Sequence, residues 1–427
     1  MAKQGPQAGI LNRPQQHLLL ATFEFVGTQP RTTLDALRGL VERELTSELV
    51  VPDAPTPPDK KEEALAEPGE LGFQSGYDRA FLTITLGLSS TGFEKLGVAE
   101  AERPTDLRPI PWGELGDPQP ATASGDFVLQ ICADDLYICE HVVRRIEAEQ
   151  GAELNVLSTV IGSQRYTTRS GRTSRGEGRA LIGFLDGVSN LDPRHSDEDQ
   201  KLVFVDPSQV SYPANPAPGE STEQNQYGGE GASKPHFPEG LHAVPTSEPA
   251  WTEDGSYMVV RVSSFETRGW DKATLNDQEH TVGRFKFSGA SLDLEDKEED
   301  LDKPPAFEAE QTKTDVPVTA HIRKANPRGG AVDLERRIFR RGYPLIGPQD
   351  GGSVRRGLIF VAFGRTITTQ FEFIVRAWMR NSDFPFPGAG IDPLFGKVGD
   401  TVLGGGYYFV PPLEKKTQPW TWKIPSS

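Results

Sequence analysis

Three short segments of this chain carry residue types that suit proton transfer and metal ligation. The segment GFLDG at 183–187 places the Asp186 carboxylate on a turn flanked by glycines. The segment HIRKANPR at 321–328 begins with His321 and continues with closely spaced cations. The segment RRGYP at 340–344 adds a pair of arginines. Together they offer a metal ligand, an acid–base group and cations for an anionic ligand.

These groups match what peroxide reduction at a haem iron requires. A ferric haem takes one neutral imidazole and leaves its opposite position open. On the open side, a carboxylate can carry a proton between peroxide oxygens, and an arginine can stabilise the charge on the departing oxygen. Gly183 and Gly187 would let the backbone bring Asp186 close to a flat macrocycle. Arg340 would favour the ionised form of that carboxyl group.

Taken singly, each signal is weak. The chain has seven histidines, and a lone histidine is more often structural than a metal ligand. A glycine-flanked aspartate is usually only a turn residue. His321 differs because three cations follow it within one short segment, and cations suit the anionic propionates of haem. These cations are Arg323, Lys324 and Arg328.

The bulk properties narrow the class of protein. The 427 residues are 36% hydrophobic and 25% charged, as in soluble globular proteins. The net charge of −16 argues against nucleic acid or an anionic membrane surface as a partner. No apolar run approaches the roughly 20 residues that span a bilayer. Residues 1–14 hold neither an apolar signal segment nor twin arginines, which predicts a cytoplasmic protein. The sequence does not fix the oligomeric state.

The two cysteines, Cys132 and Cys139, exclude a disulfide framework or a thiolate metal cluster within one chain. Both lie in apolar surroundings. We expect two buried thiols.

Strand-like and helix-like segments alternate in both halves of the chain, which predicts a duplicated α+β unit with antiparallel sheets flanked by helices. We place the boundary between the two units after residue 200. Residues 1–200 form the N-terminal half, which carries the GxxDG turn, and residues 201–427 form the C-terminal half. The strand-like segments are 17–26, 79–88, 126–132, 256–265 and 357–364, and the helix-like segments are 32–48, 134–150, 271–283 and 366–380.

Loop-like segments separate these elements. Residues 51–71 are rich in Pro, Lys and Glu and predict a mobile loop, and residues 206–256 predict a long surface insertion. Residues 293–303 hold seven carboxylates, which could bind Mn²⁺, although acidic runs are usually solvated loops. Polar, proline-rich surroundings predict exposure of three tryptophans. These are Trp251, Trp420 and Trp422.

Several segments in the same order resemble the dye-decolorizing peroxidases, and the larger, more active members in particular. The resemblance extends from about Ala8 to the carboxyl end. It rests on GRALIGFLDGVSN (178–190), GSYMVVRV (255–262), QEHTVGRFKFSG (278–289), HIRKANPR (321–328), RRGYP (340–344) and RGLIFVAF (356–363).

The resemblance implies a duplicated ferredoxin-like fold with one haem b per chain in the C-terminal half. It implies His321 as the iron ligand, Asp186 as the acid–base residue and Arg340 as the distal arginine. Arg340 is preferred to Arg341 because the family places this arginine four residues before a proline, here Pro344.

Further residues follow from the same resemblance. Leu358 and Phe360 match the apolar pair above the haem, and Asp392 matches the carboxylate that accepts the imidazole N–H. Haem contacts are expected from three further residues, which are Gly187, Arg323 and Arg328. Some family members have a polar residue two positions after the distal arginine. Gly342 stands there in this chain, so catalysis would rest on Asp186 and Arg340 alone.

The implied function is the reduction of hydrogen peroxide coupled to one-electron oxidation of dyes, phenols and other aromatic donors. One alternative is a haem-binding or haem-iron handling protein with incidental peroxidase activity, which a distal pocket closed by Leu358 and Phe360 would also fit. A third reading, a ferredoxin-like binding module without haem, would require that the purified protein lack a Soret band.

Overall fold

The computed structural model describes residues 5–46, 80–164, 178–208, 247–301, 303–305, 315–328, 331–348, 353–414 and 421–425. The predicted loop 51–71, most of the insertion 206–256 and Trp420 lie outside these residues.

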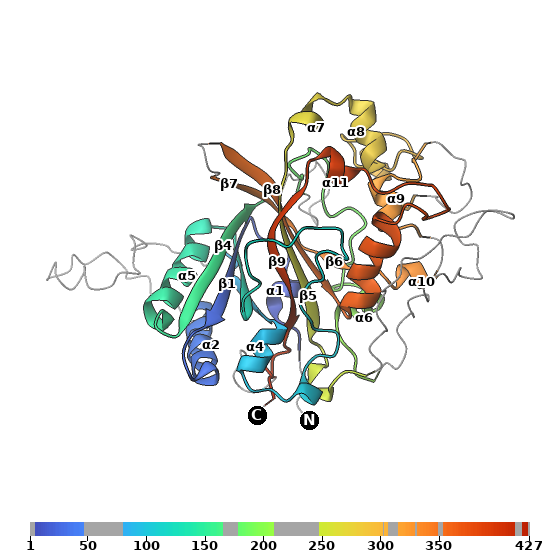
Figure 1. Ribbon diagram of the computed structural model, residues 1–427. Helices are drawn as coiled ribbons and strands as arrows, with labels where there is room; N and C mark the ends of the chain where they lie inside the picture. Colours follow the sequence, from blue (N-terminus) through green and yellow to red (C-terminus); the bar gives the residue numbers. More distant parts are fainter. Residues whose placement is uncertain are drawn as a thin grey trace.

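The N-terminal half is a four-stranded antiparallel sheet covered by two helices. Its strands are β1 (His17–Phe25), β2 (Thr83–Leu88), β3 (Phe127–Ala133) and β4 (Leu154–Ser163), in the order β2-β3-β1-β4. Helices α2 (Pro30–Thr46) and α5 (Leu136–Gln150) cover it, and shorter helices are α1 (Ala8–Leu11), α4 (Ser90–Lys95) and η1 (Glu100–Glu102) (Figure 1). The chain order is β-α-β-β-α-β, the ferredoxin-like arrangement.

The C-terminal half repeats this arrangement. Its strands are β5 (Ser256–Ser264), β6 (Phe339–Arg340), β7 (Tyr343–Pro348), β8 (Val354–Gly364) and β9 (Thr401–Val410), with the order β9-β5-β8-β7 and with β6 also paired to β8. In the N-terminal half β1 lies between β4 and β3, and in the C-terminal half β5 lies likewise between β9 and β8. The predicted duplication with antiparallel sheets is therefore confirmed.

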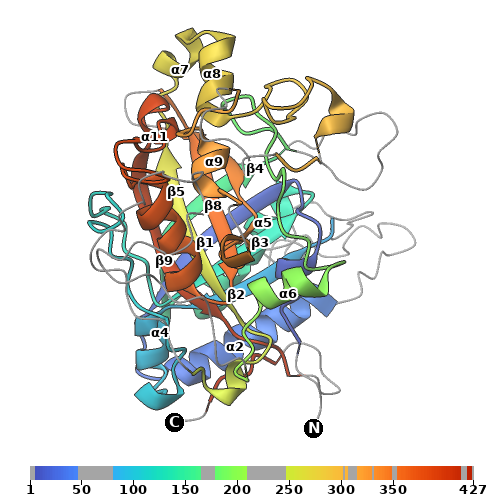
Figure 2. The same cartoon turned by 90° about the vertical axis from the view of Figure 1, so that its right-hand side faces the viewer.

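Most helices of the C-terminal half lie at one end and along one side of the sheets (Figures 1 and 2). They are α6 (Asp197–Val203), η2 (Ala250–Thr252), α7 (Arg268–Lys272), α8 (Leu275–Val282), η3 (Glu298–Asp300), α9 (His321–Ala325), α10 (Ala331–Leu334), η5 (Ile367–Glu372), η6 (Ile374–Met379) and α11 (Leu394–Lys397). Helices α7, α8, α9 and α11 lie at the upper end in Figures 1 and 2.

The two sheets join into one nine-stranded sheet that closes on itself. Single residue pairs link β2 to β9 and β4 to β7, and β5 at one end of the sheet also pairs with β8. Alternate residues of β1 belong to different cores. Leu19 and Phe23 pack in the core that includes α2 and α5, whereas Leu18 and Leu20 pack in the core between the two sheets. Strands buried on both faces explain the near-continuous apolar runs in the sequence.

Several local predictions needed correction. The predicted helix 32–48 begins at Pro30, since proline suits a first helical turn. The predicted helix 271–283 is two helices, because the Thr274 side chain caps α8 by accepting the Asp277 N–H. Segment 366–380 is helical but has the wide turns of a π-helix.

The predicted exposure of Trp251 and Trp422 was wrong. Both are buried, at 7% and 9% exposure. The Trp251 ring packs against Phe93 and Phe409, and its N–H donates to the Glu102 carbonyl oxygen at 2.7 Å. Polar neighbours in sequence therefore do not predict exposure where an indole N–H has a buried acceptor.

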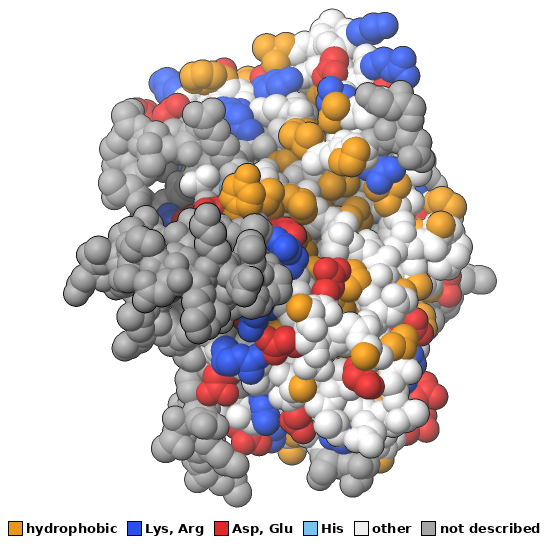
Figure 3. Space-filling view, turned by 90° about the vertical axis from the view of Figure 1, so that its left-hand side faces the viewer, with side chains coloured by type: hydrophobic (Ala, Val, Ile, Leu, Met, Phe, Trp, Pro, Cys, Tyr) orange, Lys and Arg blue, Asp and Glu red, His pale blue; other side chains and the backbone are white. Residues whose placement is uncertain are grey.

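Charged side chains of both signs are interspersed on the face of the molecule seen in Figure 3. The acidic run 293–303 includes the short helix η3, in which Asp300 is buried and pairs with Lys303. Within the described residues, no group of three or more His, Cys, Asp or Glu side chains could hold a metal ion. No helix of the described chain is long and apolar enough to cross a membrane.

Both cysteines are buried, and neither forms a disulfide bond. Burial raises the pKa of Cys132 to about 11 and that of Cys139 further. Because only the thiolate is nucleophilic, we expect neither thiol of the native protein to react with Ellman's reagent at pH 8. Both should react in guanidinium chloride. Rapid labelling of one thiol in the native protein would contradict this burial.

Candidate functional site

A cavity of about 310 Å³ lies between residues 180–191, which follow β4, and the helices of the C-terminal half. Strand β8, helices α9 and α11 and the segments η5 and η6 all contribute lining residues. Its lining is mostly apolar, and it includes Ile182, Leu185, Val282, Leu358, Phe360 and Ile374. A cavity of this kind, with few polar groups on apolar walls, is typical of small-molecule and cofactor sites.

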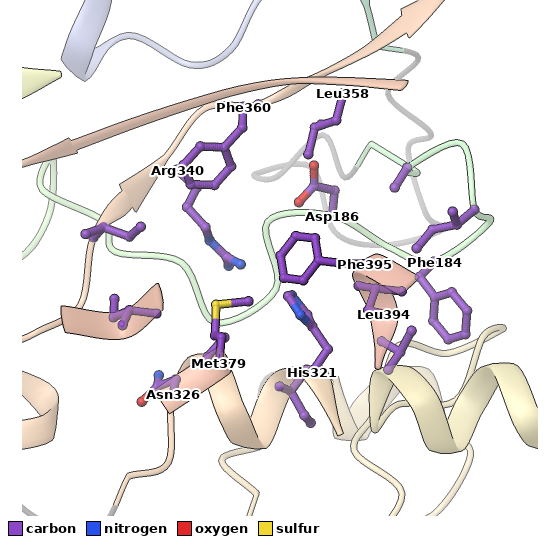
Figure 4. Close-up of a pocket in the computed structure, with 18 of the residues that line it drawn as sticks. Phe184, Asp186, His321, Asn326, Arg340, Leu358, Phe360, Met379, Leu394 and Phe395 are labelled. Carbon is purple, nitrogen blue, oxygen red and sulfur yellow. The ribbon is translucent and has the colours of Figure 1, made fainter. Parts of the chain in front are cut away.

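His321 occupies one side of the cavity, at the first residue of α9 (Figure 4). Its Nδ1 lies 2.7 Å from Oδ2 of Asp392, whose side chain is fully buried. A carboxylate only accepts hydrogen bonds, so the proton of a neutral imidazole is on Nδ1. The ring points into the cavity, which leaves Nε2 to act as a ligand.

Three further contacts fix Asp392 and its neighbourhood. Its Oδ1 accepts the Leu394 N–H at 2.9 Å, and its own N–H donates to the Met379 carbonyl oxygen at 2.8 Å. Phe395, in the following helix α11, stands edge-on to the His321 ring, with 6.3 Å between centroids. The structure therefore brings together His321 and Asp392, which are 71 residues apart in the chain.

Asp186 lies on the other side of the cavity, near Leu358 (Figure 4). Its turn depends on two glycines in the left-handed region, Gly183 with φ +93° and Gly187 with φ +78°. The Asp186 N–H donates to the Gly178 carbonyl oxygen at 2.9 Å, and Oδ1 accepts the Gly187 N–H at 2.7 Å. The backbone of the turn thus sets the direction of the carboxylate.

Arg340 shares this side with Asp186, and its guanidinium points toward the centre of the cavity. Its N–H donates to Asn190 Oδ1 at 3.0 Å, and Nη2 donates to the Val188 carbonyl oxygen at 3.0 Å. These bonds tie β6 to the segment that carries Asp186. Among the described side chains, Arg340 and Asp186 face the same cavity without forming a direct ion pair (Figure 4).

Arg341 has a different role from its neighbour. It is buried, it does not line the cavity, and Nη1 donates to the Ile10 carbonyl oxygen at 3.1 Å. Leu358 and Phe360, which were predicted to lie on the Asp186 side, alternate with buried Ile359 along β8 and both line the cavity. Alternation along strands separates cavity-facing from core-facing side chains here.

Three arginines of the cavity lining interact with one another. Burial, together with the positive charges of Arg337 and Arg340, lowers the pKa of Arg328 to about 10. Arg337 also pairs with Asp199 at 2.9 Å. Repulsion among cations at the wall of an apolar cavity favours a ligand with anionic groups at this position.

The other two cations of the 321–328 segment are directed away from the cavity. Arg323 is buried, and Nη1 donates to the Val316 carbonyl oxygen at 3.0 Å. Lys324 is buried as well, and Nζ donates to the carbonyl oxygens of Asn381, at 2.8 Å, and Phe384. Neither side chain lines the cavity.

Sequence reasoning missed one wall of the cavity. Ile374, Val375 and Met379 of η6 line it, as does Phe395. The helical spacing of 366–380 indicated a helix, but a π-helix turns different residues toward its neighbours than an α-helix does.

An ion cluster behind Phe395 was also missed. Asp117 pairs with Arg261 at 3.2 Å and with Arg380 at 2.7 Å. Both guanidinium carbons lie near the Phe395 ring, 5.7 and 5.6 Å from its centroid. The available signal was the charged Arg261 within the apolar strand GSYMVVRV, since charged residues in buried strands are rare unless paired.

The donor set of this cavity fits a haem. One imidazole has its Nδ1 engaged and its Nε2 directed inward, as an axial ligand requires. The walls are apolar, as the faces of a macrocycle require, and the arginine cluster suits two propionates. The opposite side holds a carboxylate and a guanidinium and has no second imidazole among the described lining residues.

Comparisons with known proteins agree with this fit. Models of the N-terminal and C-terminal Dyp-type peroxidase domains match residues 7–163 and 228–415. A DyP-type peroxidase from Cellulomonas bogoriensis aligns with a TM-score of 0.66 and 24% identity over 99% of this chain and 96% of that one. Ferric DtpA from Streptomyces lividans gives 0.66 and 21%, over 99% and 96%.

A curated relative carries a different name. The deferrochelatase of Escherichia coli (strain K12) is 26% identical over 415 residues, which cover 95% of this chain and 82% of that protein.

Gly187 provides a test of the turn that carries Asp186. A Cβ there would meet nothing within 4 Å, so only its positive φ resists substitution. We expect Gly187→Ala to lower the free energy of unfolding by about 1 kcal/mol, measured by urea denaturation. Gly113→Ala, at an equally open position without a positive φ, should change it by less than about 0.5 kcal/mol. Equal effects would contradict the backbone argument.

Proposed function

Because the chain belongs to the Dyp-type peroxidase family, we propose that it uses hydrogen peroxide to oxidise dyes, phenols and other aromatic donors in one-electron steps. Family membership gives the protein haem as its cofactor and peroxidase as its activity. The proposal adds the residues and the class of donor. His321 is the iron ligand, Asp186 moves the proton and Arg340 stabilises charge.

The observation that supports these roles is the placement of groups on opposite sides of one cavity. His321 approaches from α9, while Asp186 and Arg340 face it from the other side (Figure 4). An iron ligand and an acid–base group must be separated in this way, because peroxide reacts on the face that the ligand leaves open.

Four groups would hold the haem. His321 Nε2 would bind the iron, and Asp392 would keep the imidazole oriented and raise its basicity. Arg328 and Arg337 would take the propionates. When bound, haem would supply a redox centre that gives two electrons to peroxide and regains them from donors one at a time. The wall residues Leu358 and Phe360 limit water and large donors on the Asp186 side.

The Asp186 carboxylate would accept the proton from one peroxide oxygen and deliver it to the other, so that water departs. Its Oδ1 already accepts the Gly187 N–H, which fixes the carboxylate without neutralising it. Arg340 would stabilise the negative charge that develops on the departing oxygen. Gly342 contributes no polar side chain, so Asp186 and Arg340 would carry this step together.

A second candidate function is haem-iron handling, which the deferrochelatase relative favours. The same cavity would then hold haem as the substrate. Repeated turnover with peroxide and a donor, with no loss of haem, supports the peroxidase. Release of iron with recovery of free porphyrin supports the alternative.

Asp186→Asn tests the acid–base role. We expect unchanged haem binding and a rate of the peroxide-induced Soret change that falls at least about 100-fold, the range for loss of general acid–base catalysis. Stopped-flow absorbance measures this rate. Asp192→Asn is the matched control, because its carboxylate binds Arg194 and His195 outside the cavity. A wild-type rate in Asp186→Asn would show that Asp186 is not the acid–base residue.

Arg328→Gln tests the propionate site. A charge-assisted hydrogen bond contributes about 1.5–3 kcal/mol, so haem affinity should fall about tenfold or more in a fluorescence-quenching titration of the apoprotein. Haem dimethyl ester, which lacks the anionic groups, should bind wild type and variant equally.

Arg323→Gln serves as the comparison for that titration, because Arg323 lies outside the cavity. It should leave the ratio of haem to ester affinity unchanged. If Arg323→Gln lowers the ratio and Arg328→Gln does not, the site has been assigned to the wrong arginine.

A further inference from the structure

The Lys324 ammonium is a buried charge that the proposed catalytic steps do not use. Its side chain has 0% exposure. Nζ donates to the carbonyl oxygens of Asn381 and Phe384 and lies 5.5 Å from the centroid of the Phe384 ring. Burying a charge is unfavourable unless hydrogen bonds and opposite charges compensate, so these contacts matter to the local structure.

Both carbonyl groups belong to the loop that carries Asp392. This loop leaves η6 after Met379 and returns to it, because the Asp392 N–H donates to the Met379 carbonyl oxygen at 2.8 Å. Within the loop, the Gly390 N–H donates to the Ser382 carbonyl oxygen at 2.8 Å. Lys324 therefore connects α9, which begins at His321, to the loop that supplies the partner of His321.

Lys324 is also electrostatically linked to Asp392. Burial lowers the pKa of Lys324 to about 8, and the carboxylates of Asp392 and Asp383 oppose that decrease. A buried cation beside a buried carboxylate reduces the negative charge that the carboxylate presents to its other partner. Here that other partner is the N–H of the imidazole, at 2.7 Å.

We propose that Lys324 is a positioning residue for the iron ligand, which holds the Asp392 loop against α9 and moderates the charge of Asp392 at His321. A carboxylate partner raises the basicity of a ligating imidazole, and a nearby cation limits this effect. Lys324 thereby sets the reduction potential of the bound iron from outside the cavity. This inference rests on the proposed function, in which His321 is the ligand.

The test is a spectroelectrochemical titration of the haem-loaded full chain. Lys324→Met removes the charge but keeps a side chain of similar length. Asp392 retains its bonds to Leu394 and Met379, so it should remain in place with a less compensated charge. We expect a lower reduction potential in Lys324→Met and a value near wild type in Lys324→Arg. An unchanged potential in Lys324→Met would overturn the proposal.

A double variant tests whether the effect passes through Asp392. In an Asp392→Asn background, Lys324→Met should shift the potential much less than it does in the wild type. An equal shift in both backgrounds would mean that Lys324 acts directly on the iron, which overturns the proposal. If Lys324→Met does not fold, Lys324→Gln is used in its place in both titrations. The glutamine removes the charge and keeps an N–H donor for the two carbonyl groups.

Arg336→Met is the matched control. Arg336 is a buried cation that donates to the Thr369 carbonyl oxygen and lies over the Phe373 ring. Phe373 packs on Trp378 in the same aromatic cluster as Phe384. The control should lower the thermal midpoint and leave the potential unchanged. If it shifts the potential as Lys324→Met does, loss of any buried cation in this cluster suffices and the proposal fails.

Asp392→Asn alone separates this inference from the function that it rests on. It should raise the potential, because the imidazole loses its anionic partner. If Asp392→Asn raises the potential and Lys324→Met leaves it unchanged, only the inference about Lys324 is wrong. If neither variant shifts it, the assignment of His321 as the ligand is wrong.

Discussion

The hydrogen bond between His321 and Asp392 is the interaction on which the site depends. It joins the start of α9 to a loop that also contacts Lys324 of α9, η6 and α11. It also assigns the Nδ1 proton and directs Nε2 into the cavity, because a carboxylate can only accept. Without this hydrogen bond, the His321 ring could rotate. Asp186 and Arg340, on the opposite side of the cavity, would then not face a ligand of defined orientation.

The duplicated fold explains how residues so distant in sequence reach one cavity. Each half contributes a βαββαβ unit, and the closed sheet makes a rigid core between them. Asp186 lies in the connection after the first unit, while His321 lies in the connection between β5 and β6 of the second and Arg340 lies in β6 itself. The hydrogen bonds from Arg340 to Val188 and Asn190 lock these two connections together.

Residue type and order, together with the family resemblance that they carry, were sufficient to predict the duplicated architecture and the polar groups Asp186, His321 and Arg340 that face the cavity. They were not sufficient for Arg323 and Lys324, because α9 has only five residues and shows no periodicity that separates its cavity side from its buried side. Met379 escaped notice because a π-helix turns different residues toward the cavity than the α-helix that the spacing of 366–380 indicated, and Phe395 because the four-residue helix α11 is too short to show a spacing. Trp251 was misjudged because its burial depends on Phe93 and Phe409, which are remote in sequence.

The most direct test of this account is the absorption spectrum of the His321→Gly variant loaded with haem, recorded with and without added imidazole. The account predicts one haem per chain in the wild type, an altered Soret band in His321→Gly, and restoration of the wild-type band by free imidazole in the vacated space beside Asp392. A wild-type spectrum in His321→Gly without imidazole would show that another residue binds the iron and would contradict the account.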